Sequence, residues 1–261
     1  MTPVLSVVTV CYEAKEALSR TMESLLSQTW TKFEYVVADG GSSDGSAACL
    51  EEAVPRFAEK GISLRYVSEP DRGIYDAMNK GARLAEGRWL LFLNAGDLLA
   101  GPETLERFFS VPSDAQILYG DTLCVYQGHT RLYPALSLDR LPYEMAFCHQ
   151  SAFVSRKLML SMPYDVGYRV CADHHFFLRA RLSGATFEYR PLPVSVYEIA
   201  GFSDTHKLLA HREQLRMQRE LGLFRITPAW LARELRFYAK QTIKSLFGQK
   251  LIDKVRERRL R

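Results

Sequence analysis

The sequence lacks the features that mark secreted, membrane-spanning or metal-cluster proteins. Its five cysteines form no CxxC pair and are odd in number, so reduced thiols are expected rather than a disulfide framework. The amino terminus has no basic region, and its apolar run is too short for a signal peptide or a membrane span. These absences predict a cytoplasmic protein.

Several familiar catalytic and binding motifs are also missing. The chain has no GxGxxG fingerprint, no phosphate-binding loop, no nucleophile elbow and no recognisable nucleic-acid-binding module. Covalent catalysis and nucleic-acid partners are therefore not expected. The chain does have 261 residues, of which 47% are apolar and 25% charged, and these can bury the core of one large α/β domain.

Strand-like and helical patterns alternate along the chain. Strands are predicted at 5–10, 33–38, 63–67 and 89–93, and helices at 15–28, 46–60 and 75–85. This order predicts a mostly parallel sheet with covering helices. Further strands are predicted at 117–126, 131–133, 186–190 and 194–197, and helices at 173–182 and 205–223. We expect one domain over 1–225, followed by a helical tail over 226–261.

Polar residues stand at the carboxyl ends of the first four predicted strands, where ligands bind in sheets of this kind. Each end carries hydrogen-bonding or charged side chains: Thr9 at the first, Asp39 at the second, Asp71 and Arg72 at the third, and Asn94 and Asp97 at the fourth. A carboxylate such as Asp97, just after a buried strand, suits Mg²⁺ or Mn²⁺ that also binds phosphates. The alternative is that Asp97 caps the helix starting near Pro102 or shapes a turn.

Two further segments carry polar side chains near the same edge. The glycines that follow Asp39 allow close backbone approach, and the serines there could bond a nucleoside or cap the next helix. On a helix beginning near residue 74, Asp76, Asn79 and Lys80 share one face and could point toward the sheet edge. A solvated face with an ordinary Asp to Lys pair is the alternative, and it is favoured for Lys80.

The second half of the chain offers a candidate general base. Asp173 begins an apolar helical stretch and could deprotonate an acceptor hydroxyl, although a helix N-cap is the alternative. His149 and Gln150 form a polar pair that opens a predicted strand, and a satisfied buried histidine is an equal interpretation. The neighbouring His174 and His175 face different directions on a helix, so we do not expect them to bind a metal.

Taken together, these motifs resemble the inverting family-2 glycosyltransferases of the GT-A fold. The resemblance runs from residue 5 to about 203 and includes Val-Val-Thr9-Val-Cys-Tyr12, Asp39-Gly-Gly-Ser-Ser-Asp44-Gly, Glu69-Pro-Asp71-Arg72-Gly-Ile-Tyr-Asp76-Ala-Met-Asn79-Lys80-Gly, Asn94-Ala-Gly-Asp97, His149-Gln150 and Asp173. It implies a donor half over 1–100 and an acceptor half over 101–225. The subgroup it looks most like builds bacterial exopolysaccharide, capsule or lipopolysaccharide units.

The resemblance also implies roles for residues. Donor contacts would come from Thr9, Asp39, Asp71, Arg72, Asp76, Asn94 and Asp97, with His149 and Gln150 on the acceptor side. Asp97 would hold a divalent cation, Mg²⁺ or Mn²⁺, on the diphosphate, and Asp173 would be the base. Two positions depart from the family pattern: Glu13 replaces a usual Asn, and Gly96 stands where many relatives carry a second acid.

The implied activity is transfer of a sugar, with inversion, from a UDP-, GDP- or dTDP-sugar to a saccharide or lipid-linked acceptor. The alternative is a non-catalytic nucleotide-sugar-binding or scaffold protein that keeps the fold. A third class, the nucleotidyltransferases, should carry a Gly-rich basic loop after the first strand, which 11–18 lacks.

Charge is distributed unevenly along the chain. From residue 229 to 261 there are ten Lys and Arg against three Asp and Glu, whereas the first 228 residues hold 24 basic and 27 acidic residues. A helix there would place Leu231, Leu235 and Tyr238 on one side and basic side chains on the other. The tail is therefore predicted to contact an anionic membrane peripherally, on the inner face of the cell membrane. Packing on the domain or a homo-oligomer contact is the alternative.

Overall fold

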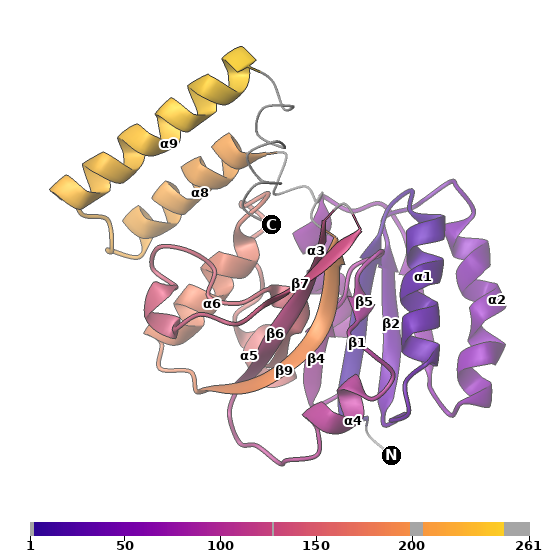
Figure 1. Ribbon diagram of the computed structural model, residues 1–261. Coiled ribbons are helices and arrows are strands. Elements are labelled where there is room, and N and C mark those ends of the chain that lie inside the picture. Colours follow the sequence, from indigo (N-terminus) through magenta and orange to yellow (C-terminus); the bar gives the residue numbers. More distant parts are fainter. Residues whose placement is uncertain (1–2, 127, 199–205, 248–261) are drawn as a thin grey trace. The chain divides into compact units, whose positions relative to one another are not determined.

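The computed structural model describes residues 3–126, 128–198 and 206–247, and the chain divides into two compact units, Met1–Met217 and Gln218–Arg261. The first unit is an α/β sheet with helices on its faces, which confirms the predicted fold class (Figure 1). The domain boundary predicted after residue 225 stays a prediction.

The first part of the sheet is parallel, in the order β3-β2-β1-β4. Its strands and helices match the predicted ranges closely: β1 Leu5–Cys11, α1 Lys15–Leu26, β2 Phe33–Asp39, α2 Ser46–Glu59, β3 Leu64–Ser68, α3 Ile74–Leu84 and β4 Trp89–Phe92. Alternate residues of each strand face opposite sides of the sheet. Val7 packs with Leu18 and Phe57 of α1 and α2, whereas Val8 touches α3 at Gly81, so the sheet is covered on both faces.

The remaining strands make the sheet mixed rather than mostly parallel. They are β5 Leu98–Leu99, β6 Ile117–Tyr126, β7 His129–Tyr133, β8 Ala152–Ser155 and β9 Phe187–Glu198. β8 pairs antiparallel with both β4 and β6, and the order continues through β9 to β5. The strands predicted at 186–190 and 194–197 form the single long, bent strand β9, whose register against β6 shifts beside Pro193 (Figure 1). Proline cannot donate to a sheet ladder, which explains both the shift and the two-strand prediction.

Short helices in the second half complete the first unit: α4 Thr104–Phe108, η1 Leu138–Arg140, η2 His149–Ser151, α5 Arg156–Ser161, α6 Ala172–Leu182 and α8 Lys207–Glu220, which runs past the unit boundary. His149 and Gln150 thus lie in a 3-10 turn just before β8, rather than in the strand itself. Residue 205, the predicted start of the helix that becomes α8, lies outside the described residues.

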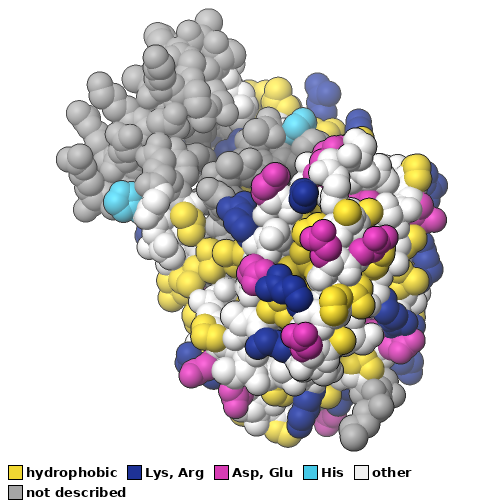
Figure 2. All heavy atoms as spheres, turned by 90° about the vertical axis from the view of Figure 1, so that its right-hand side faces the viewer, with side chains coloured by type: hydrophobic (Ala, Val, Ile, Leu, Met, Phe, Trp, Pro, Cys, Tyr) yellow, Lys and Arg dark blue, Asp and Glu magenta, His cyan; other side chains and the backbone are white. Residues whose placement is uncertain are grey.

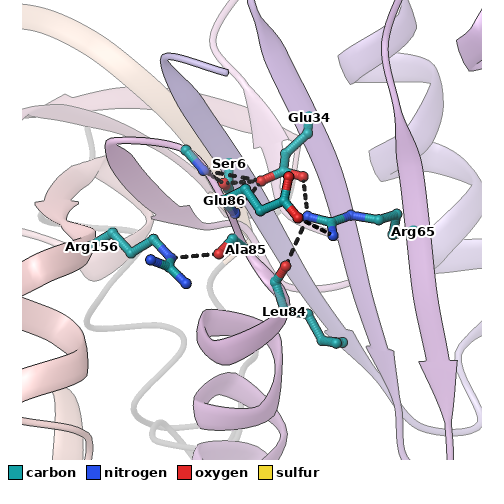
Figure 3. Close-up of polar contacts among 8 residues, drawn as sticks. Ser6, Glu34, Arg65, Leu84, Ala85, Glu86 and Arg156 are labelled. Atoms are coloured by element: carbon teal, nitrogen blue, oxygen red, sulfur yellow. Dashed lines mark hydrogen bonds and ion pairs between the residues drawn. The ribbon is translucent and has the colours of Figure 1, made fainter. Parts of the chain in front are cut away.

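The amino ends of the parallel strands meet at a buried carboxylate (Figure 3). Glu34 of β2 is 3% exposed and accepts hydrogen bonds from the Ser6 hydroxyl (2.6 Å), the Arg65 guanidinium (2.5 Å) and the backbone N–H groups of Glu86 (2.5 Å) and Gly87 (3.1 Å). Burial raises the pKa of Glu34, but these donors outweigh it, so the pKa lies below its ordinary value. The network ties β1, β2, β3 and the segment before β4 together.

On the face that carries α1 and α2, acidic and basic side chains are interspersed (Figure 2). An ion pair of 2.6 Å between Arg56 and Glu23 joins these two helices. Both side chains are about half exposed, so the pair contributes little stability. This face has the mixed charge of a solvated surface.

The second unit contains α9 Pro228–Phe247. The Thr227 hydroxyl accepts a hydrogen bond from the backbone N–H of Trp230 (3.1 Å), so Thr227 caps this helix, whose first residue is Pro228. Leu231, Leu235 and Tyr238 of the predicted apolar side are exposed. Residues 248–261 of the predicted tail lie outside the described residues. In the part of the chain that is described, no helix is both long and apolar enough to cross a bilayer.

Candidate active site

A cavity of about 560 Å³ opens beside the carboxyl end of β4. Five of the side chains singled out by the sequence line it: Asn94 and Asp97 after β4, His149 and Gln150 in η2, and Asp173 in the first turn of α6. They meet because β8, which directly follows η2, pairs with β4. The other predicted site residues lie outside this lining: Thr9, Asp39, Asp71, Arg72 and Asp76.

Asp97 is a buried carboxylate held in a tight turn. It is 8% exposed, and its Oδ2 accepts a hydrogen bond from the backbone N–H of Asn94 (3.2 Å). Burial raises its pKa to about 6, although the charge of His149 and a hydrogen bond from Gln150 act in the opposite direction. Gly96, which lies between Asn94 and Asp97 in the sequence, has a φ of +100°. This conformation favours glycine over a second acidic residue in the motif.

The turn-shaping alternative for Asp97 is therefore partly right, since one of its oxygens closes the turn. It does not cap a helix: α4 begins at Thr104, with Glu103 before it. Because Oδ2 of Asp97 closes the turn, Oδ1 is the oxygen that can bind another partner.

Next to Asp97, the side-chain oxygen of Asn94 is buried without a hydrogen-bond partner. An unpaired buried oxygen beside a carboxylate of raised pKa is the donor set that a hard divalent cation prefers. The two residues therefore fit Mg²⁺ or Mn²⁺. No group of three or more His, Cys, Asp or Glu side chains that could hold a metal occurs among the described residues, so such a cation would need further ligands from the donor and from water.

Asp173 is joined by side chains from two other segments. Its Oδ2 lies 3.0 Å from Nδ1 of His149, and its Oδ1 accepts hydrogen bonds from the Tyr75 hydroxyl (3.1 Å) and the His174 backbone N–H (2.8 Å). Burial raises the pKa of Asp173, but the bond and charge of His149 outweigh it and the pKa is lowered. Burial lowers the pKa of His149, and Asp173 outweighs that effect in turn, so this pKa is raised. The pair favours an ionised Asp173 that accepts a hydrogen bond from Nδ1 of His149.

The start of α6 is held from another helix. α6 begins at Ala172, so Asp173 does not occupy the N-cap position, and the residue there makes no side-chain cap. Instead the buried carboxylate of Glu213 in α8 accepts hydrogen bonds from the backbone N–H groups of residues 169–171, at 2.7 to 2.9 Å. Sequence reasoning missed Glu213, because a Glu within a charged helical pattern gives no sign of what it faces.

The turn after β2 is closed by its own side chains. Asp39 is 2% exposed and accepts hydrogen bonds from the Ser42 backbone (3.0 Å), the Ser42 hydroxyl (2.5 Å) and the Ser68 hydroxyl (2.5 Å). Burial raises its pKa, yet these donors outweigh it and the pKa is lowered. Its role as a nucleoside contact stays a prediction.

Glu13, one of the two departures from the family pattern, joins the ends of β1 and β2. Its φ of +49° lies in the left-handed region, where Asn is enriched among non-glycine residues, which accounts for the Asn usual at this position. Its carboxylate accepts hydrogen bonds from the Ser43 backbone (2.8 Å) and hydroxyl (3.0 Å), and its own N–H donates to the Ser42 hydroxyl (2.8 Å). The replacement thus keeps this turn anchored.

Thr9 is fully buried, and its hydroxyl donates to the Leu93 carbonyl (2.6 Å). This bond joins β1 to the chain that leaves β4. A nucleoside contact through the same hydroxyl would require that bond to open, and the role stays a prediction.

The segment after β3 approaches the turn after β2. A side-chain carbon placed on Gly40 would lie 2.7 Å from Oδ2 of Asp71, so the Asp71 side chain would have to shift if a larger residue stood at position 40. Arg72 is largely exposed and pairs with Asp76 (3.1 Å), and this hydrogen bond lowers the pKa of Asp76. Arg72 is therefore accessible to an anion. The donor contacts of Asp71, Arg72 and Asp76 stay predictions.

The other two polar residues of α3 serve the fold. Lys80 pairs with Glu69 (2.8 Å) rather than with the Asp76 of the alternative interpretation. The Asn79 side chain donates to the Tyr164 carbonyl (2.8 Å) and accepts from its N–H (3.0 Å). Asn79 thus fixes the chain that leads toward α6.

Comparison with known proteins places this geometry in a family. The model of Glycosyl transferase family 2 matches residues 6–160, more than half of the chain. A PGL/p-HBAD biosynthesis glycosyltransferase of Mycobacterium bovis (strain BCG / Pasteur 1173P2) is 34% identical over 85% of this chain and 87% of its own length. A validoxylamine A glucosyltransferase of Streptomyces hygroscopicus subsp. jinggangensis is 36% identical over 48% of this chain and 29% of its own length.

Solved structures show the same fold. S. aureus TarS in complex with UDP superposes with a TM-score of 0.63 at 18% identity, over 82% of this chain and 63% of the TarS chain, so the match spans less than two thirds of that protein. The mannosyltransferase PcManGT from Pyrobaculum calidifontis, in complex with GDP-Man and Mn²⁺, superposes with a TM-score of 0.64 at 18% identity. The match covers 88% of this chain and 67% of the PcManGT chain. With the family match, this shows that the chain belongs to glycosyl transferase family 2, whose members transfer sugars on the GT-A fold.

Proposed function

We propose that this chain transfers a sugar from a nucleoside diphosphate sugar to an acceptor hydroxyl in one inverting displacement. The acceptor oxygen would bond to the anomeric carbon while the bond from that carbon to the diphosphate breaks. Such a step needs a base for the acceptor proton and a counter-charge for the leaving group. The observation that carries the proposal is that one cavity is lined both by the ion-paired Asp173 and by the oxygens of Asn94 and Asp97.

Asp173 is the proposed base. The hydrogen bond and charge of His149 hold it ionised, and the Tyr75 hydroxyl orients its other oxygen. The proton of the acceptor hydroxyl would pass to Asp173 as the new bond forms. General base catalysis of this kind is worth about 10² to 10⁴ in rate.

Asp97 and Asn94 are the proposed holders of Mg²⁺ or Mn²⁺. When bound, the cation offsets the charge that develops on the departing nucleoside diphosphate. The Mn²⁺ in the PcManGT complex supports this assignment. Thr9, Asp39, Asp71, Arg72 and Asp76 would meet the nucleoside and donor pocket from the ends of the other strands.

The proposed donors are UDP-, GDP- or dTDP-sugars, and the proposed acceptor is a saccharide or a lipid-linked saccharide on the side of His149 and Gln150. UDP and GDP-Man in the TarS and PcManGT complexes support the donor class. The pathway we propose is cell-surface polysaccharide or lipopolysaccharide synthesis. A relative named as a PGL/p-HBAD biosynthesis glycosyltransferase supports a biosynthetic role.

A peripheral contact of residues 229–261 with anionic membrane is part of the proposal, because the apolar side chains Leu231, Leu235 and Tyr238 of α9 are exposed on a basic segment. Each basic residue near the headgroups would add about 1 kcal/mol. Co-sedimentation of the full chain with anionic and with neutral vesicles tests it. Equal recovery on both vesicle types would count against it.

The experiment that tests the activity is a thermal-shift screen of UDP-, GDP-, dTDP- and CMP-sugars with and without Mn²⁺, followed by assays of transfer and of slow donor hydrolysis. We expect one donor class to raise the midpoint further with Mn²⁺ and to be hydrolysed. A chain that binds a nucleotide sugar but neither transfers nor hydrolyses it would instead be the non-catalytic binding protein.

A further inference from the structure

Part of the cavity is lined entirely by apolar residues. We call this part the apolar wall; it comprises residues 133–136, at the end of β7 and beyond, and residues 145–147, before η2. Its members are Tyr133, Pro134, Ala135, Leu136, Met145, Ala146 and Phe147. Tyr133 and Leu136 are 44% and 46% exposed, so large apolar side chains face open space within reach of a ligand.

The apolar wall is held in place by buried polar groups. Asp121 of β6 is 5% exposed and accepts hydrogen bonds from the Ala135 backbone N–H (2.9 Å) and the Tyr189 hydroxyl (2.7 Å). The two segments of the wall are joined by a hydrogen bond from the Leu136 N–H to the Ala146 carbonyl (2.6 Å). The surface therefore exists before any ligand arrives, which lowers the cost of binding.

A second support lies behind the apolar wall. Phe147 stacks on Tyr119 of β6 with ring centroids 4.3 Å apart, and both rings are buried. Phe147 is also only two residues from His149, the partner of Asp173. The wall thus continues directly into the part of the cavity where the acceptor proton would be taken.

The wall is poorly suited to a purely polar saccharide. It carries no charged side chain, and the Tyr133 hydroxyl is its one polar side-chain group. The backbone N–H groups of Ala135 and Leu136 are already used within the fold. Sugar hydroxyls placed here would lose water without gaining partners, whereas an apolar group would gain from burial.

We propose that the apolar wall is an acceptor subsite for an apolar aglycone, an aromatic ring or alkyl chain attached to the saccharide that receives the sugar. The assignment rests on the proposed function, in that the aglycone lies on the wall when the acceptor hydroxyl faces Asp173. It makes Leu136 a specificity-determining residue. The enzyme would then select glycosides with an apolar group close to the acceptor sugar over free saccharides.

The test compares glycosides that differ only in the aglycone. Equilibrium binding of p-nitrophenyl and octyl glucosides and mannosides would be measured by ligand-observed NMR against the methyl glycosides of the same sugars. Leu136→Ser removes the apolar side chain, and Leu132→Ser is the matched control. Leu132 is also 46% exposed and lies four residues away on β7, but outside the cavity lining.

We expect the aryl or the octyl glycoside to bind at least tenfold more tightly than its methyl partner. The ratio should fall below about threefold in Leu136→Ser and stay unchanged in Leu132→Ser. The aryl and octyl arms then tell an aromatic ring from a lipid chain. A wild-type ratio near one, or equal losses in both variants, would overturn the subsite.

Donor hydrolysis without acceptor, measured in all three proteins, separates this proposal from the one on which it rests. Unchanged hydrolysis in Leu136→Ser together with a lost aglycone preference supports both. If the wild type neither transfers nor hydrolyses any donor, the proposed function fails, and the binding ratios still decide whether the wall takes an apolar group.

Discussion

The two ends of the parallel strands both bury a carboxylate, but the pKa values of the two groups are shifted in opposite directions. At the amino ends, Glu34 is met by four donors, and its pKa is lowered although burial acts to raise it. At the carboxyl ends, Asp97 has fewer partners, and burial raises its pKa to about 6. Beside it the Asn94 oxygen has no partner at all.

Partners and pKa distinguish Glu34 from Asp97, whereas burial does not. Glu34 and Asp97 are 3% and 8% exposed. Both oxygens of Glu34 are satisfied within the fold, so this group holds the strands together. Where bonding capacity is left over next to a cavity, a ligand is expected to supply the missing partner.

The largest effect is expected from Asp173→Asn. The amide keeps the shape of the side chain but cannot take the acceptor proton, so the transfer rate should fall by about 10² to 10⁴. Steady-state transfer measures it, with donor binding by thermal shift as the control. Transfer at the wild-type rate with this variant would remove Asp173 from the mechanism.

Glu34→Gln tests the structural end of the comparison. The amide keeps only one acceptor oxygen, so its NH₂ group would face either Arg65 or the three donors Ser6, Glu86 and Gly87, and the negative charge beside Arg65 would be lost. We expect a loss of about 1 to 3 kcal/mol in the free energy of unfolding, measured by urea titration, because Arg65 is partly exposed and keeps its bond to Glu86.

The same carboxylate should make stability pH-dependent. Because the folded pKa of Glu34 is lowered, its contribution to the free energy of unfolding is present above the unfolded pKa of about 4.3 and is lost as pH falls through the lower folded value.

The activity of the folded fraction of Glu34→Gln should stay close to wild type. A large loss of specific activity without a loss of stability would contradict the division between the two ends.

Glu213→Gln should loosen the backbone that leads into Asp173, since an amide offers one acceptor oxygen where the carboxylate accepts from three N–H groups. We expect about 1 to 3 kcal/mol of destabilisation and a lower transfer rate with donor binding intact. Comparison with Glu213→Ala shows how much of the destabilisation comes from the lost hydrogen-bond acceptors and how much from lost packing. Unaltered stability in both variants would show that these bonds do not hold the start of α6.

The smallest effect concerns the pH dependence of Mn²⁺ binding. A group of pKa about 6 is ionised at pH 7.5 and only about one-tenth ionised at pH 5, so Mn²⁺ affinity should fall about tenfold over this range. Calorimetric titration measures it. Asp97→Asn should bind weakly at both pH values, and a pH dependence that survived in this variant would have to come from another group.

Local patterns were sufficient for the donor half. The buried apolar runs and turn residues predicted β1 to β4 and α1 to α3 within about two residues, and the strand-end motifs located Asn94 and Asp97 at the cavity. The reason is that carboxyl ends of parallel strands meet at one edge, so a strand and the residue after it define a position in space. The same reasoning placed Asp173 and His149 in the acceptor half, but not against one another.

By itself, the sequence determined the family, the parallel half of the sheet and five of the polar residues that line the cavity, because these depend on short-range periodicity and on motifs. Only the tertiary structure decided that β8 lies against β4, that His149 pairs with Asp173, that Glu213 holds residues 169–171 and that residues 133–136 and 145–147 form one apolar wall. The parallel order expected from the first half is present as β3-β2-β1-β4, whereas the second half adds antiparallel pairs around the parallel β6–β9 pair. One bent strand also replaced two predicted ones. Such contacts join segments tens of residues apart, and the free energy that selects them comes from packing and burial that no local window contains.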